Sequence, residues 1–449
     1  MSKVGFVGFG EVNTPVDVII SRCNAAADAL EKEGLSLVRV VPVDDDYEEK
    51  HVNTAIAALK KEPFEALVLC VGGWIPTHAV IKIAEHFRHL PVVLWGLCGW
   101  REGDKIVTTA DQAGTTGLRA TLEQMGYTFQ YVYDIIGLPS RSKKVADFCK
   151  AALAAKALRH SRAGMAGYRD MNLYGTLYDG CSLKKVIGPE IETFEMLEMQ
   201  QRYEKITEKE INDIVENRIK QWTFTSPAKE EGMRMAAGYY LAVKEIADER
   251  GYKAISIKDV DGMKKLIGFP PAPIFMLLQE DGYLTVPEND SLGCVTLMMM
   301  KELTGQTPFY LEFYEFFEKS VLAGVPDYVP SQVVEGEVTV MPAAFGELNE
   351  GILNISKVKT GEVTMNRLLY KDGKYVMHMV HGNGKTPPKW NEYGWADPAP
   401  QLPSLEIEIP SVEDFADHVG CQHYIITYGD NRPLIRNICR ILGIEVYES

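Results

Sequence analysis

The regular alternation of strand and helix patterns over the first 160 residues constrains the fold more than any other feature of the sequence. Short apolar runs rich in β-branched and aromatic residues are separated by segments whose apolar residues recur at helical spacing. The expected strands span residues 3–9, 35–41, 66–71, 91–96 and 128–134. Apolar strands that alternate with helices are typical of a doubly wound parallel sheet covered on both faces. The N-terminal part is therefore predicted to be an α/β domain.

The length of the chain calls for more than one hydrophobic core. At 449 residues, two or three domains are expected. Strand and helix patterns restart near residue 164, and strand-like runs dominate after residue 325. We predict an α/β fold with an N-terminal α/β domain at 1–163, a second doubly wound parallel-sheet domain at 164–325 and a mainly β C-terminal domain at 326–449.

Composition narrows the functional classes. A formal net charge of −15 argues against nucleic acid and against an anionic membrane surface as partners. The eight cysteines are scattered without a CxxC pair, which is typical of reduced thiols and indicates neither a disulfide framework nor a zinc ribbon. Because the sequence contains neither a signal-peptide pattern nor an apolar run of membrane-spanning length, we expect a cytoplasmic protein that acts on a small molecule.

Two carboxylates mark the stretch 284–312, which reads as strand, helix and strand. Glu288 follows the first strand pattern and Glu312 follows the second. In a parallel βαβ unit the two strand ends would meet at the carboxyl edge of the sheet, where open α/β folds bind ligands. Such a pair could bind a divalent metal, share a proton, or divide acid and base roles. An acidic residue after a strand can also be an ordinary solvated loop residue.

A histidine near the C-terminus could join these acids. His423 opens an apolar strand pattern. A neutral imidazole can complete an oxygen-rich Mn²⁺, Co²⁺ or Mg²⁺ site without adding charge. A single histidine before a strand is also commonly structural, so this residue is a candidate ligand at this stage.

Several other residues lie where a sugar could be bound. Trp74, Trp95 and Trp100 stand beside glycines after expected strands, where an indole ring suits the apolar face of a sugar as well as it suits core packing. Arg101 and Arg169 follow glycine-rich segments and are candidates for pairing with an anionic substrate. Ordinary surface pairing is the alternative for both arginines.

Two segments resemble the L-fucose isomerase family, to which the L-arabinose isomerases are more distantly related. One contains Glu288, Asn289 and the helix that leads to Glu312, and the other contains Gln422 and His423. The resemblance implies a Mn²⁺-type ion held by both glutamates and by His423, with Co²⁺ or Mg²⁺ as alternatives. It also implies aldose–ketose isomerisation through a cis-enediol, in which one of the glutamates moves the proton. Asn289 and Gln422 would then contact the substrate.

The same resemblance implies a homo-oligomer, a hexamer or a trimer, whose sites are completed by the N-terminal domain of a neighbouring subunit. Trp74, Trp95 and Trp100 would then serve another subunit's site. The substrate stays open among an open-chain hexose, a deoxyhexose, a pentose and a sulfonated hexose such as sulfoquinovose.

Two other functions remain at this stage. A non-catalytic cytoplasmic sugar-binding protein could use the same domains but would not need the acid pair. A nicotinamide-dependent oxidoreductase is suggested by Gly8 and Gly10, which follow a strand as in a dinucleotide fingerprint. Asn13 replaces the third glycine of that fingerprint, which weakens this reading.

Overall fold

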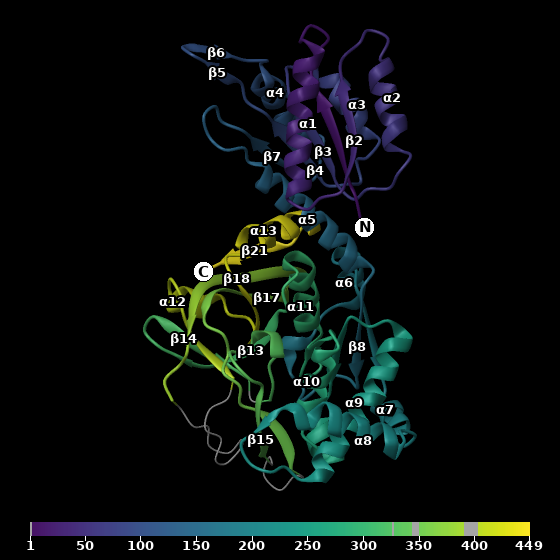
Figure 1. Ribbon diagram of the computed structural model, residues 1–449, viewed down its shortest axis with the longest axis vertical. Helices are drawn as coiled ribbons and strands as arrows, with labels where there is room; N and C mark the ends of the chain where they lie inside the picture. Colours follow the sequence, from purple (N-terminus) through teal and green to yellow (C-terminus); the bar gives the residue numbers. More distant parts are fainter. Residues whose placement is uncertain (1, 326, 344–349, 390–402) are drawn as a thin grey trace. The chain divides into compact units, whose positions relative to one another are not determined.

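The computed structural model describes residues 2–325, 327–343, 350–389 and 403–449, and the chain divides into two compact units (Figure 1). The first unit comprises residues 1–156 with 433–443, and the second comprises 157–432 with 444–449. Within the described residues, no helix has the length and apolar character needed to cross a membrane. The domain boundaries expected at 163 and 325 stay a prediction.

The first unit contains the parallel sheet that the sequence predicts. Its five strands run in the order β2-β1-β3-β4-β7, and every neighbouring pair is parallel. Each expected strand is confirmed, with shifts of one or two residues at its ends. The strands are β1 (Val4–Phe9), β2 (Leu37–Val43), β3 (Leu67–Val71), β4 (Val92–Gly96) and β7 (Phe129–Tyr133).

Helices cover both faces of this sheet, which explains why β1, β3 and β4 are apolar on both sides. Residues of α1 (Val16–Lys32) and α5 (Ser142–Arg159) pack in the core on one face. Residues of α2 (Lys50–Leu59), α3 (Thr77–Glu85) and α4 (Asp111–Gln124) pack on the other face. The C-terminal helix α13 (Arg432–Leu442) adds Ile441 to the first of these cores. A short hairpin joins β5 (Trp100–Glu102) to β6 (Lys105–Val107).

The second unit begins with another parallel sheet. Its four strands run in the order β12-β11-β8-β9. They are β12 (Leu284–Val286), β11 (Ala254–Ile257), β8 (Arg162–Ala166) and β9 (Glu190–Phe194). One hydrophobic core joins this sheet to α7 (Met196–Tyr203), α8 (Glu208–Asn217), α9 (Glu230–Arg250) and α10 (Ala272–Glu280). The second doubly wound α/β region is therefore present, in a smaller sheet than the first.

The C-terminal half of this unit is mainly β, as predicted. Six antiparallel strands pair in a closed ring, β17-β20-β13-β14-β19-β18, because β17 also pairs with β18. The short strand β21 (Glu445–Glu448) adds to β18 in parallel. The ring strands are β13 (Phe309–Phe316), β14 (Ser320–Gly324), β17 (Gly361–Lys371), β18 (Lys374–Lys385), β19 (Ser404–Glu408) and β20 (His423–Tyr428). Smaller elements are β10 (Thr223–Phe224), β15 (Thr339–Ala343), β16 (Gly351–Asn354) and α12 (Val412–His418).

The expected βαβ unit at 284–312 is wrong in topology. β12 lies in the parallel sheet, whereas β13 lies in the antiparallel ring, so the two strands are not in one sheet. The intervening helix α11 (Ser291–Thr304) is apolar on almost every side and contacts β8, β11 and β12 as well as β13, β17 and β20. A helix that is apolar all round is buried between two layers, and this one carries the chain from one sheet to the next. Glu312 consequently lies within β13 and not beyond its end.

A buried ion pair anchors the start of α11 to the ring. Asp290 is the N-cap residue of α11 and accepts a hydrogen bond from the Gly293 N–H at 2.9 Å. Its carboxylate also accepts hydrogen bonds from Arg367 Nη2 on β17 at 2.8 Å and from the Tyr310 hydroxyl on β13 at 2.8 Å. Both charged side chains of the pair are fully buried. One carboxylate therefore joins three elements.

Removing the cation of this pair is expected to destabilise the second unit. Arg367→Leu would leave Asp290 charged and buried without its cationic partner, which costs about 3–5 kcal/mol of unfolding free energy. Urea unfolding monitored by circular dichroism measures the change. The control Lys357→Ala removes an exposed ion pair with Glu335 and should shift the unfolding free energy by about 1 kcal/mol or less. Equal stability of Arg367→Leu and the unaltered chain would contradict this prediction.

Candidate active site

Three residues far apart in the sequence converge in the second unit. Ligand-type atoms of Glu288, Glu312 and His423 all lie within 4.8 Å of one another. His423 Nε2 is 3.0 Å from Glu312 Oε2, and His423 Nδ1 is 3.7 Å from Glu288 Oε2. The exposed fractions of the three side chains are 13% for Glu288, 15% for Glu312 and 4% for His423. The three residues that the sequence suggested as ligands therefore lie together, although through a different topology than expected, and their role as ligands stays a prediction.

Strand pairing in the ring sets the distance between Glu312 and His423. They are direct partners in the antiparallel pair of β13 and β20. The Phe313 N–H donates to the Gln422 carbonyl at 3.1 Å, so the neighbouring residues Glu312 and His423 form a non-hydrogen-bonded pair of the ladder. Side chains are closest at such positions and share one face of the sheet. The ring of Tyr310 stacks on the imidazole of His423, with 4.4 Å between centroids, and limits its rotation.

Glu288 reaches the cluster from the other side, through an unusual backbone turn. Glu288 and Asn289 have φ values of +63° and +52°, in the left-handed region that residues with a side chain seldom adopt. Such conformations cost about 1–3 kcal/mol each and are concentrated at functional sites. Asn289 holds the turn in place, because its side-chain amide donates to the carbonyls of Ala166 and Tyr168, both at 3.0 Å.

A second set of buried charges supports the same turn. The Glu288 N–H donates to Asp259 Oδ1 at 2.9 Å. Asp259 opens a π-helix, η3 (Asp259–Ile267), and its other oxygen lies 3.3 Å from Lys264 Nζ. Lys264 is also 3.4 Å from Asp327. π-Helical turns occur frequently at functional sites. Sequence reasoning assigned no role to Asp259 or Lys264, although Asp259 follows a strand in the same way as Glu288 does.

The electrostatics of the cluster favour bound protons in the metal-free protein. Burial raises the pKa of Glu288 to about 8, and the negative charges of Asp259 and Glu312 add to this effect. Although burial opposes its charge, hydrogen bonds with Cys421 and Glu312 and the charge of Glu288 raise the pKa of His423 to about 10. A cation placed among these groups would displace both protons and remove the repulsion between the carboxylates.

The donor set fits a divalent cation with a preference for oxygen ligands. Two carboxylates and one imidazole are the ligand types found around Mn²⁺, Co²⁺ and related ions. Glu288 Oε2 is buried without a hydrogen-bond partner, which is the state expected of a metal ligand. Asp290, Cys421 and His423 also lie close together. That second group is the poorer site, because the oxygens of Asp290 already accept hydrogen bonds from Gly293, Tyr310 and Arg367.

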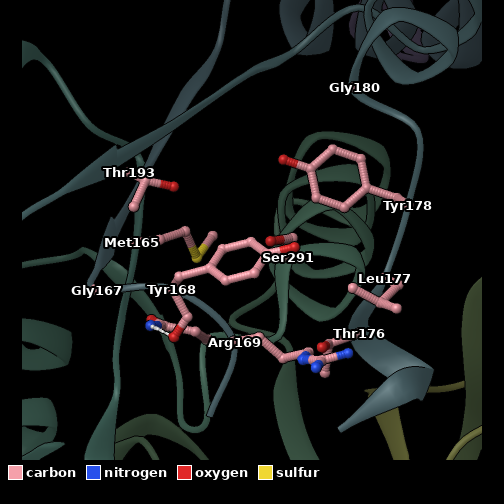
Figure 2. Close-up of a pocket in the computed structure, with 11 residues that line it drawn as sticks. Met165, Gly167, Tyr168, Arg169, Thr176, Leu177, Tyr178, Gly180, Thr193 and Ser291 are labelled. Carbon is pink, nitrogen blue, oxygen red and sulfur yellow. Dashed lines mark hydrogen bonds between the residues drawn. The ribbon is translucent and has the colours of Figure 1, made fainter. Parts of the chain in front are cut away.

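A cavity of about 180 Å³ opens beside this turn (Figure 2). Asn289 and Ser291, which flank Asp290, form part of its wall. The facing wall is the segment after β8, which includes η1 (Tyr174–Thr176) and the start of α6 (Gly180–Val186). The other lining residues are Met165, Gly167, Tyr168, Arg169, Leu177, Tyr178 and Thr193. Two of the residues predicted to contact substrate, Asn289 and Arg169, therefore line one cavity.

The remaining predicted substrate residues lie elsewhere. Trp95 is completely buried in the core of the first unit, with its indole N–H donating to Asp134 at 3.2 Å, so its burial favours the core-packing alternative. Trp74 is 37% exposed, and Arg101 is exposed on the β5–β6 hairpin. Gln422 is exposed next to His423. A role in substrate binding for these residues stays a prediction.

The support of the turn by Asp259 can be tested through stability. Asp259→Ala would remove the acceptor of the Glu288 N–H and one of the two carboxylates beside buried Lys264. The expected loss is about 3 kcal/mol or more of unfolding free energy, measured by urea unfolding. Glu216→Ala, which removes a partner of Lys220 on an exposed helix face, is the control and should cost less than about 1 kcal/mol. A loss as small as that of the control would show that Asp259 does not support the turn.

Comparisons with known proteins indicate a sugar isomerase. Residues 176–306 match the L-arabinose isomerase central domain, a segment that includes Glu288, Asn289 and α11. Over 379 residues the chain is 19% identical to the sulfoquinovose isomerases of Priestia aryabhattai and Priestia megaterium, covering 82% of this chain and 81% of each relative. The matches support the arabinose/fucose isomerase-like family at large, without singling out the L-fucose isomerases, and they indicate an aldose–ketose isomerase.

Proposed function

We propose that this chain interconverts an open-chain aldose and its ketose at one divalent cation held by Glu288, Glu312 and His423. The observation that carries the proposal is the convergence of these three side chains within 4.8 Å. Mn²⁺ is the first candidate for the ion, and Co²⁺ and Mg²⁺ are the alternatives. The central-domain match supports the proposal because it covers the turn that carries Glu288.

The reaction requires a proton to move between neighbouring carbons of the sugar. When bound, the ion would polarise the sugar carbonyl and make the adjacent C–H more acidic. One of the two glutamates, with an oxygen left free, removes that proton from C2 while the carbonyl oxygen O1 gains a proton, which gives a cis-enediol. The glutamate then returns its proton to C1 while the hydroxyl at O2 loses one and becomes the ketone carbonyl. His423 keeps Glu312 oriented through the 3.0 Å contact, and Asp259 fixes the backbone of Glu288.

The substrate class in this proposal is an open-chain hexose, deoxyhexose, pentose or sulfonated hexose. The sulfonated hexose is the class named by the two relatives, which makes it the first to assay.

We also propose a homo-oligomer whose sites are completed by the first unit of a neighbouring subunit. Trp74 and Arg101, which that unit exposes, would then be the residues that reach the site. Full activity in a monomer would argue against this assembly.

Metal removal and replacement test the activity. With a panel of aldoses followed by NMR, ketose formation should stop after EDTA treatment and return on addition of Mn²⁺.

Glu288→Gln and Glu312→Gln should each lower kcat by about 10²- to 10⁴-fold because the proton carrier or its partner is lost. Glu302→Gln, an exposed acid on α11, is the matched control and should retain activity. Turnover that is indifferent to both EDTA and Mn²⁺ would rule out the metal role, and sugar binding without turnover would favour a sugar-binding protein.

Metal binding should also release protons. Ligation requires ionised Glu288 and neutral His423, whereas their pKa values of about 8 and about 10 leave both protonated at neutral pH. Titration calorimetry with Mn²⁺ in buffers of different ionisation enthalpy should therefore give release of about one to two protons per ion at pH 7. The affinity should rise with pH through about 8, because Glu288 then ionises without the metal. Binding heats that do not depend on the buffer would contradict these protonation states.

A further inference from the structure

We propose that the cavity beside Glu288 is a subsite for an anionic group of the substrate and that Arg169 is the cation that recognises it. The identification of the ligand as a sugar rests on the proposed isomerase function. The cavity is formed within the second unit, between the carboxyl ends of β8 and β9, the start of α11 and the segment 167–180. It is bounded by Asn289, the residue directly after Glu288.

Arg169 has no carboxylate partner among the described residues. Its Nη2 donates to Asn172 Oδ1 at 3.2 Å, and its guanidinium lies 4.9 Å from the centroid of the Tyr174 ring. Its Nε is buried without any acceptor. Figure 2 shows the side chain extended along the cavity toward Thr176.

Three other partly or fully buried arginines among the described residues are paired with acids. Arg22 pairs with Asp111, and Arg218 pairs with Glu280 and Asp281. Arg367 pairs with Asp290, as described above. A buried N–H that lacks an acceptor is unfavourable unless a ligand supplies one.

The nearest carboxylate in the sequence does not neutralise Arg169. The oxygens of Asp170 accept hydrogen bonds from the backbone N–H groups of Met171, Val260 and Asp261, at 2.8–3.1 Å. Asp170 is thereby occupied in holding the start of η3. Arg169 lines the cavity, and the planar donor fork of a guanidinium matches two oxygens of a sulfonate, phosphate or carboxylate.

A second, independent observation indicates a ligand that also carries hydroxyl groups. Asn289 is only 4% exposed, and its Oδ1 has no hydrogen-bond partner although its amide nitrogen has two. An unpaired buried acceptor requires a donor such as a sugar hydroxyl. The rings of Tyr168 and Tyr178 and the side chain of Leu177 line the same cavity and suit the C–H face of a sugar (Figure 2). Cation, acceptor and apolar surface together describe an anionic sugar.

The overall charge of the protein sharpens this inference. With a net charge of −15, the chain repels anions at long range. Binding of an anionic sugar therefore requires a local cation that is not already neutralised. Arg169 is such a cation, and it lines the same cavity as Asn289, the residue after Glu288.

The test compares a charged sugar with its uncharged counterpart. The substrates are a hexose with a sulfonate on its terminal carbon and the 6-deoxy hexose that lacks only the sulfonate, both with Mn²⁺ present. The proteins are the unaltered chain, Arg169→Gln, Arg169→Lys and the control Lys184→Gln, which removes an exposed lysine paired with Glu190. A hexose 6-phosphate and a uronic acid are added to identify which anion the subsite prefers.

Arg169→Gln should raise KM for the preferred anionic sugar by about 10- to 100-fold, as expected for the loss of a charge-assisted hydrogen bond. The effect on kcat should be smaller, and Arg169→Lys should recover part of the loss. Lys184→Gln should leave KM unchanged. Equal use of charged and uncharged sugars by the unaltered chain, with the same KM in Arg169→Gln, would overturn the subsite while leaving the isomerase intact.

Binding without turnover separates the two proposals. Calorimetry with the sulfonated sugar alcohol, which cannot be isomerised, should give binding to the unaltered chain that is about 10-fold or more weaker in Arg169→Gln. If no aldose is converted with any metal but this binding difference is observed, the isomerase proposal fails and the anion subsite stands. If the sugar alcohol binds equally to both proteins, the subsite is wrong whatever the activity.

Discussion

The buried ion pair between Asp290 and Arg367 is the interaction on which the candidate site depends. Asp290 follows the turn that carries Glu288, and Arg367 belongs to the antiparallel ring that carries Glu312 and His423. The pair therefore joins, within the second unit, the two halves of a site that neither sheet could form alone. Tyr310 strengthens this junction, since its hydroxyl donates to Asp290 and its ring stacks on His423.

The turn at Glu288 combines strain with support, which is the pattern expected where function requires an unfavourable conformation. Two consecutive residues with positive φ direct the carboxylate toward His423. Asp259 holds the peptide N–H of Glu288, and Asn289 ties the turn to the segment after β8. Because the same Asn289 borders the cavity beside Arg169, one turn positions the acid and shapes the proposed substrate pocket. In the proposed reaction, this turn would fix the distance between the cavity that binds the anionic end of the sugar and the carboxylate that acts on its reacting carbon.

Sequence reasoning predicted the strands of the first parallel sheet better than it predicted how β12 and β13 are connected. Apolar runs and helical spacing are local signals, so they identified each strand of the first unit. Which sheet the strand after α11 joins depends on how this helix packs against both sheets. Such packing leaves no local signal in the sequence, and the βαβ prediction was wrong for that reason. The structure nevertheless brings the three candidate ligands within 4.8 Å of one another, and their role as ligands stays a prediction. Arg367 was missed because its partner Asp290 is 77 residues away, a pairing that no local pattern indicates.

The proposed isomerase reaction requires that Glu288, Glu312 and His423 hold one metal ion. Anomalous diffraction at the manganese absorption edge, from crystals grown with Mn²⁺, locates that ion directly. We expect a single strong peak in the second unit, coordinated by carboxylate oxygens of Glu288 and Glu312 and by a ring nitrogen of His423. A structure with Mn²⁺ bound at other residues, or with no peak at these three side chains at millimolar Mn²⁺, would contradict it.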